Sequence, residues 1–138
     1  MTRHAASLAP PPRQALLDAN LWFSIVKTDV FMEAYARDLL QLRWTTQIAK
    51  EWIRNVTQQK RTSRKKARSR YATMCSFVDG WQILHYGHLA KRFPAVDVKD
   101  RHVIAAAQKC GERVRIISSL NYRKYKIFSK ISVDRYFN

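Results

Sequence analysis

The sequence has little glycine, with three such residues in 138. The turns of a loop-rich β fold depend on glycine, so this scarcity argues against such a fold. No window reaches about 18 uncharged apolar residues, and no apolar signal-peptide core opens the chain, so we expect a cytoplasmic protein with no membrane span. The two cysteines, Cys75 and Cys110, have no neighbouring Cys or His pair. We therefore expect reduced, buried thiols and no zinc site.

Carboxylates are also scarce. Ten Asp and Glu residues face 26 Lys and Arg residues, which gives a formal net charge of +16. This excess favours a polyanionic partner, nucleic acid before an anionic membrane surface. Apolar residues make up 46% of the chain, enough to build a core, and the length suits a single domain.

The apolar pattern alternates between short strands and amphipathic helices. Residues 15–20 resemble a buried strand that ends in Asp and Asn, and 114–117 resemble a second strand. Apolar spacings of three and four predict a helix over 30–42. Further helices are expected from Thr45 or Thr46 to about Val56, from Thr62 or Ser63 to about Phe77, and from Asp97 to a C-cap at Gly111. Residues 81–86 stay ambiguous, and the helix–Gly–strand order predicts a parallel βα repeat.

A strongly basic segment lies in the middle of the chain. Seven of the eleven residues in 60–70 are basic, and no acidic residue lies between Glu51 and Asp79. Such a run can contact an RNA backbone, neutralise an acidic protein partner or form a solvated helix face. The candidate RNA-binding residues are Lys60, Arg61, Arg64, Lys65, Lys66, Arg68 and Arg70.

Three of the scarce carboxylates suit metal-dependent phosphodiester chemistry. Asp18 follows the first strand, Glu51 lies near the apolar face of a helix, and Asp100 lies where a later helix begins. Mg²⁺ and Mn²⁺ prefer such hard oxygen ligands, together with water and substrate phosphate. Plainer roles stay open. Asp18, Asp97 and Asp100 suit helix starts, and Glu51 can pair with Lys50, Arg54 or Asn55.

Three segments resemble a PIN domain of the bacterial VapC-type toxin branch, in the right order over about residues 15–120. They are Leu16-Leu17-Asp18-Ala19-Asn20, Trp44-Thr45 through Asn55, and Asp97-Val98-Lys99-Asp100-Arg101-His102-Val103-Ile104-Ala105-Ala106-Ala107. The last segment is the most specific. The resemblance implies an α/β fold, a helix-rich three-layer α/β/α domain around a short parallel sheet. It also implies a Mg²⁺- or Mn²⁺-dependent ribonuclease, acting as the toxin of a type II toxin–antitoxin pair with a small acidic antitoxin. Whether the chain forms a homodimer stays open.

The resemblance assigns roles position by position. Asp18 matches the first metal-binding Asp, and Asn20 matches its supporting Asn. Glu51 matches the helix-borne Glu, and Asp100 matches the Asp that opens the later helix, with Asp97 as an added acidic neighbour. Ser118 and Ser119 fall where the family has a Thr or Ser and an Asn. We therefore expect Asp18, Glu51 and Asp100 to converge on one metal ion.

The sequence departs from the family pattern after the last core strand. Where the family has its fourth acidic residue, this chain has Tyr122, and Ser119 replaces the usual Asn. The expected organisation is a flexible segment over 1–14, a PIN-like domain over 15–120 and a divergent basic segment over 121–138. Loss of one carboxylate weakens the second metal position more than the first.

Two function hypotheses follow from different classes. The first is a metal-dependent endoribonuclease in which Asp18, Glu51 and Asp100 hold the ion with help from Asp97. The alternative is a catalytically impaired PIN-like module that binds RNA or a partner protein without cutting. A weaker third hypothesis is a basic RNA-associated protein with no metal site.

Overall fold

A computed structural model of the protein describes residues 13–111, 114–117 and 132–134. The strands of the described residues are β1 (Arg13–Leu17), β2 (Leu40–Arg43), β3 (Val114–Ile117) and β4 (Ser132–Asp134). The α-helices are α1 (Ile25–Ala36), α2 (Thr46–Gln58), α3 (Arg64–Phe77) and α4 (Arg101–Cys110). The 3₁₀ helices are η1 (Ala19–Phe23), η2 (Gly87–Arg92) and η3 (Val98–Asp100).

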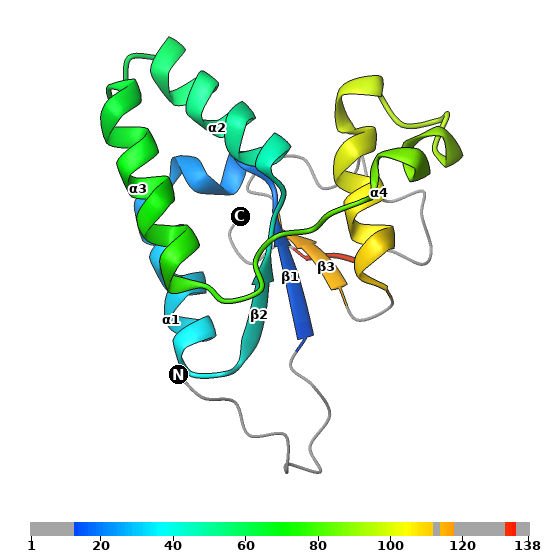
Figure 1. The fold of residues 1–138 in the computed structure, drawn as a ribbon, viewed down its shortest axis with the longest axis horizontal. Coiled ribbons are helices and arrows are strands. Elements are labelled where there is room, and N and C mark those ends of the chain that lie inside the picture. Colours follow the sequence, from blue (N-terminus) through cyan, green and yellow to red (C-terminus); the bar gives the residue numbers. More distant parts are fainter. Residues whose placement is uncertain (1–12, 112–113, 118–131, 135–138) are drawn as a thin grey trace.

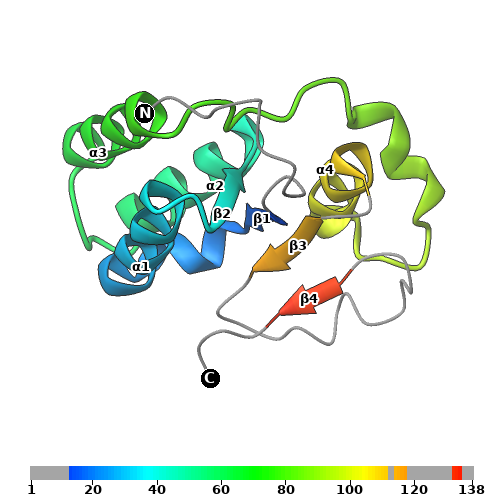
Figure 2. The same ribbon diagram turned by 90° about the horizontal axis from the view of Figure 1, so that it is seen from below.

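The strands form one parallel sheet in the order β2-β1-β3-β4 (Figure 2). Arg13 of β1 pairs with Leu40 of β2, and Leu17 pairs with Ile117 of β3. Because β1 connects forward to β2 on one side while β3 lies on its other side, the sheet has a topological switch point between β1 and β3. Ligands of open α/β sheets bind outside the carboxyl ends of strands at such a point.

The helices form one layer on each side of this sheet. Figure 1 shows α1, α2 and α3 on the left and α4 on the right. The helices α2 and α4 both begin above the carboxyl ends of the strands (Figure 1). The predicted helix-rich three-layer α/β/α architecture is confirmed. None of the helices in the described residues combines the length and apolar character needed to cross a membrane.

The predicted helix over 30–42 is wrong at both ends. The helix α1 begins earlier, at Ile25, where the hydroxyl of Ser24 accepts a hydrogen bond from the Lys27 amide at 3.1 Å. It ends at Ala36, and Asp38 then takes a positive φ of 60°, a backbone region that aspartate tolerates better than most residues. The leucines that continued the helical spacing belong to the turn and to β2.

The other predicted elements lie close to their expected places. The hydroxyls of Thr45 and Ser63 cap α2 and α3. Gly111 ends α4 at a φ of 95°, as expected of a glycine C-cap. The ambiguous segment 81–86 contributes a single parallel bridge, in which Gln82 pairs with Trp44 beyond the end of β2.

The expected boundaries of the domain are only partly visible. The strand β1 begins at Arg13, two residues before the expected domain start. Residues 1–12 lie outside the described part of the chain, as do most residues of the segment 121–138. From that segment, Ser132–Asp134 pair in parallel with β3 as the edge strand β4.

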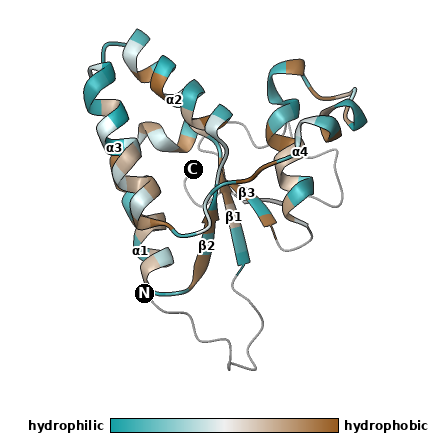
Figure 3. Cartoon of the chain, viewed as in Figure 1, coloured by the Kyte–Doolittle hydropathy of each residue, from teal (hydrophilic) through white to brown (hydrophobic). Residues whose placement is uncertain are grey.

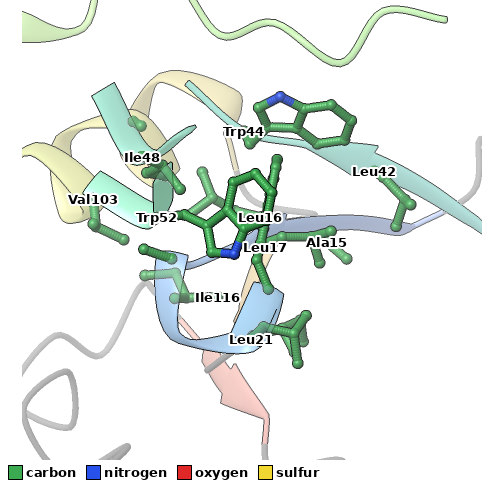
Figure 4. Close-up of a cluster of buried hydrophobic side chains, with 14 of the residues drawn as sticks. Ala15, Leu16, Leu17, Leu21, Leu42, Trp44, Ile48, Trp52, Val103 and Ile116 are labelled. Carbon is green, nitrogen blue, oxygen red and sulfur yellow. The ribbon is translucent and has the colours of Figure 1, made fainter. Parts of the chain in front are cut away.

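The core is built around tryptophan. Trp22, Trp44 and Trp52 are almost completely buried, and Figure 4 shows Trp44 and Trp52 beside Leu16, Leu17 and Ile48. The Trp44 ring stacks on Trp81 at 5.1 Å between centroids and meets the edge of Trp22 at 5.1 Å. The three buried tryptophans therefore belong to the core.

Burial of three titratable groups predicts a loss of stability in alkali. Burial raises the pKa of the Cys75 and Cys110 thiols and of the Tyr71 phenol above their usual values. As the pH rises, these groups therefore lose their protons at a lower pH in the unfolded chain than in the folded chain. The contribution of the three protonated groups to the free energy of unfolding is complete below about pH 8 and falls as the pH rises through about 9 to 10. We expect the urea midpoint to fall between about pH 8 and 10.5. Tyr71→Phe should show a smaller fall, and identical pH profiles for the two proteins would contradict the assignment.

Candidate functional site

Asp18 lies where the sheet topology predicts a site. It directly follows β1, and its amide donates a hydrogen bond to the Ile117 carbonyl of β3 at 3.0 Å. This contact places Asp18 at the switch point between the two strands. The residue is only 3% exposed. One carboxylate oxygen, Oδ1, accepts a hydrogen bond from the Ala19 amide at 2.8 Å, so Asp18 also caps η1.

Glu51 lies beside a histidine. Its Oε2 lies 3.7 Å from Nε2 of His102, which brings together the middle of α2 and the first turn of α4. The Glu51 side chain is 36% exposed and the His102 side chain 13% exposed. The carboxylate therefore has access to solvent, while the imidazole lies close to it on the protein side.

The two aspartates near α4 take different roles. Asp97 is exposed, and its Oδ1 accepts a hydrogen bond from the Lys99 amide at 3.2 Å, so it caps η3 as the plainer reading allowed. Asp100 is half-buried and stands at the N-cap position of α4, but its side chain makes no capping hydrogen bond there. Of the two, only Asp100 directly precedes α4, the position where the resemblance implies a metal-binding Asp.

A groove of about 830 Å³ opens between α2, η2 and the start of α4. Glu51 and His102 line it, whereas Asp18 and Asp100 do not. Cations surround this single carboxylate, and they come from all three elements and from η3: Lys50, Arg54, Lys91, Lys99 and Arg101. The cations give the groove a positive potential, which favours anionic ligands.

The sequence analysis did not predict most of these groove cations. Lys50 and Arg54 lie on α2, whereas Lys99 and Arg101 lie about fifty residues later, so their spacing in the sequence gives no sign that they line one groove. Arg101 has a further, structural role. Its guanidinium donates to the carbonyls of Val96 and Pro94 at 3.0 and 3.1 Å, which holds the preceding loop against α4.

The basic run lies elsewhere. None of the seven predicted RNA-binding side chains lines the groove. Five of the seven lie on α3, whose upper half is hydrophilic in Figure 3. Arg61, Lys66 and Arg70 instead line a smaller pocket between α3, η1 and α2.

The donor chemistry fits a magnesium-type ion, but the geometry is open. Asp18, Glu51 and Asp100 supply hard oxygen atoms. Within the described residues, however, no group of three or more His, Cys, Asp or Glu side chains is placed to hold a metal ion. The expected convergence of the three carboxylates is therefore not seen there. Mg²⁺ commonly takes one or two carboxylates and completes its shell with water and phosphate, and the residues present fit that kind of site.

Ser118 and Ser119, which were predicted as supporting residues, lie outside the described residues, as does Tyr122, the position of the missing fourth acid. Asn20 lies on η1, two residues after Asp18.

The comparisons with known proteins bear on the fold. No protein-family model matches the sequence, and no curated protein matches it. Among solved structures, the chain is similar to VapBC2 from Rickettsia felis bound to a promoter DNA fragment, with 11% identity and a TM-score of 0.60. DNA-bound VapBC from Salmonella typhimurium gives 12% and 0.64, and VapBC-1 from nontypeable Haemophilus influenzae gives 12% and 0.61.

These likenesses extend over nearly the whole domain. Each covers 88% of this chain and 96–97% of the other chain. At such low identity the likeness establishes the fold and nothing finer. Together with the parallel sheet order β2-β1-β3-β4, it shows that the chain shares the fold of these VapBC chains, the α/β/α arrangement expected of a PIN-like domain.

Proposed function

We propose that the protein is a metal-dependent endoribonuclease that hydrolyses RNA phosphodiester bonds. The observation that carries this proposal is the groove in which Glu51 and His102 lie among five cations. A carboxylate within a basic groove combines a ligand for a divalent ion with a surface for the RNA backbone.

Different residues of the chain would contact the RNA and hold the metal ion. Lys50, Arg54, Lys91 and Lys99 contact phosphates and set the path of the strand along the groove. His102 lies 3.7 Å from the Glu51 carboxylate and, when protonated, would pair with it. One or two of the carboxylates of Asp18, Glu51 and Asp100 would hold Mg²⁺ or Mn²⁺, with water and substrate phosphate as the other ligands. When bound, the ion supplies an activated water and neutralises charge on the leaving oxygen.

We further propose that this nuclease is the toxin of a toxin–antitoxin pair with an acidic antitoxin. The neighbours of known structure are VapBC complexes, two of them bound to DNA. The net charge of +16 suits an acidic protein partner as well as RNA.

A second candidate function is a PIN-like module that binds RNA without cutting. Two observations favour it. The described residues hold no group of three metal-binding side chains, and Tyr122 stands where the family pattern has its fourth acid.

Cleavage of a mixed RNA pool, with and without Mn²⁺, separates the two functions. The nuclease predicts fragments that appear only with the metal, and chelation with EDTA should stop their formation. The binding module predicts intact RNA at every metal concentration, with retention of the pool on the protein at low salt. Intact RNA together with no retention would contradict both candidates.

A further inference from the structure

The groove that contains Glu51 has a part of its lining that carries no charge. The uncharged lining residues are Gln47 on α2, Tyr86 at the start of η2, Gly87 and Ala90 on η2, and Val98 on η3. We call these five residues the neutral patch. A phosphate group finds no cation on such a surface, so the patch suits a different part of a nucleotide.

The neutral patch lies beside the carboxylate of the groove. Gln47 and Glu51 are four residues apart on α2, and both line the groove. Side chains at this spacing are neighbours on one face of a helix, with about 5–6 Å between their Cβ atoms. A group bound at the patch would therefore belong to a nucleotide close to the phosphate that lies at Glu51.

Tyr86 supplies an aromatic ring to the patch. Its side chain is half-buried, and it packs against the hydrophobic core while it also lines the groove. Its hydroxyl donates a hydrogen bond to Oε1 of Gln47 at 3.0 Å, which links the start of η2 to α2. A ring that is already held by the core and by this bond loses little freedom when a ligand stacks on it.

The same hydrogen bond sets the orientation of the Gln47 side chain. Because Oε1 accepts from Tyr86, the amide presents Nε2 and its two donor hydrogens on the other side. Gln47 is exposed, so these donors are within reach of a ligand in the groove. Ring nitrogen and keto oxygen atoms at the edges of nucleobases accept such hydrogen bonds.

Val98 and Gly87 add apolar surface and space. Val98 is 70% exposed, although its side chain is apolar. Gly87 has no side chain, and a Cβ added there would have no atom of the described residues within 4 Å. An aromatic ring, an exposed apolar side chain, open space and one amide together suit a flat heterocyclic ligand.

We propose that the neutral patch binds one base of the RNA, which stacks on Tyr86 and accepts a hydrogen bond at its edge from Nε2 of Gln47. The inference deepens the proposed function, on which it rests, by adding a base contact to the phosphate contacts of the groove. Tyr86 and Gln47 thereby make binding depend on the bases, whereas the cations respond only to the backbone.

A plainer role for this pair of residues is structural, because their hydrogen bond also holds η2 beside α2. The two roles differ in the ligand that they affect. Loss of a structural link changes the groove for every polyanion, whereas loss of a stacking ring weakens only ligands that carry bases.

The test measures binding of two fluorescent strands to the full chain by anisotropy. One strand is a single-stranded RNA of about eight nucleotides in which cytidine and adenosine alternate, so that it does not pair with itself. The other is an abasic ribose-phosphate strand of equal length and charge. EDTA is present throughout, so the measurement does not depend on cleavage.

Four variants are compared with the natural chain. Tyr86→Leu keeps apolar bulk against the core but removes the ring, and Tyr86→Phe keeps the ring but removes the hydroxyl. Gln47→Leu removes the amide. Phe77→Ala is the matched control, because it removes an aromatic ring that is 49% exposed and does not line the groove.

We expect the natural chain to bind the RNA about tenfold more tightly than the abasic strand. Tyr86→Leu should remove most of this preference and leave the affinity for the abasic strand unchanged, whereas Tyr86→Phe and Phe77→Ala should keep most of it. Gln47→Leu should weaken RNA binding by about threefold.

The proposal is overturned if the natural chain binds both strands equally, or if Tyr86→Leu weakens both strands alike. It is also overturned if Tyr86→Phe or Phe77→Ala loses as much of the preference as Tyr86→Leu. Cleavage of the RNA pool with Mn²⁺ distinguishes this failure from that of the proposed nuclease. Cleavage without a base preference contradicts the base site alone, and a base preference without cleavage contradicts the nuclease alone.

Discussion

Asp18→Asn is expected to reduce metal-dependent RNA cleavage by about 10²-fold or more while the fold stays intact. The substitution removes the negative charge at the end of β1. It retains a side-chain oxygen that can accept the hydrogen bond from the Ala19 amide, so the cap of η1 is kept. Asn therefore separates ligand chemistry from capping, whereas Ala would remove both.

The matched control is Asp79→Asn, which makes the same chemical change at an exposed position that does not line the groove. Initial rates at saturating Mn²⁺ and thermal unfolding curves should be recorded for the three proteins. Unchanged cleavage in the Asp18 variant would mean that the Asp18 carboxylate only caps η1 and does not act in cleavage. Equal losses at both positions would point to a general effect of charge.

Trp44→Ala is expected to lower the free energy of unfolding by about 3–5 kcal/mol. The Trp44 side chain is completely buried between Trp22 and Trp81, so truncation leaves a large cavity and removes two aromatic contacts. Its backbone bonds to Trp81 and Ile83 remain available. Natural domains are stable by only about 5–15 kcal/mol, so this variant should be close to unfolding near body temperature.

Urea unfolding with an unchanged m-value measures the effect. Trp44→Phe, which keeps an aromatic ring, should lose much less than Trp44→Ala. Phe77→Ala provides an exposed aromatic comparison, because Phe77 is 49% exposed. If the alanine substitutions at 44 and 77 cost the same, the tryptophan cluster is not the centre of the core.

The sequence was informative where local signals and periodicity agreed. The helices α2 and α3 each follow a hydroxyl cap and carry a consistent pattern, and α4 combines its apolar stripe with Gly111. The strand β2 was missed because four residues are too few to show a strand period. Its leucines also continued the spacing of the preceding helix, and only the left-handed turn at Asp38 separates the two.

The candidate site was predicted in part for a similar reason. The position of Asp18 follows from the order of strand and carboxylate, which is local. The contact between Glu51 and His102 joins residues far apart in the chain, and it depends on how α4 packs beside α2. The groove additionally needs the path of η2 and η3, two short helices with little pattern of their own.

The central place of β1 in the sheet sets an order of events during synthesis. Its partner across the switch point pairs Leu17 with Ile117, one hundred positions later (117 − 17). At about 5–20 residues per second, the ribosome needs roughly 5–20 s to supply that partner. Until then one edge of an apolar strand is open to mispairing. The Asp18 site therefore forms late, after nearly the whole domain has been made.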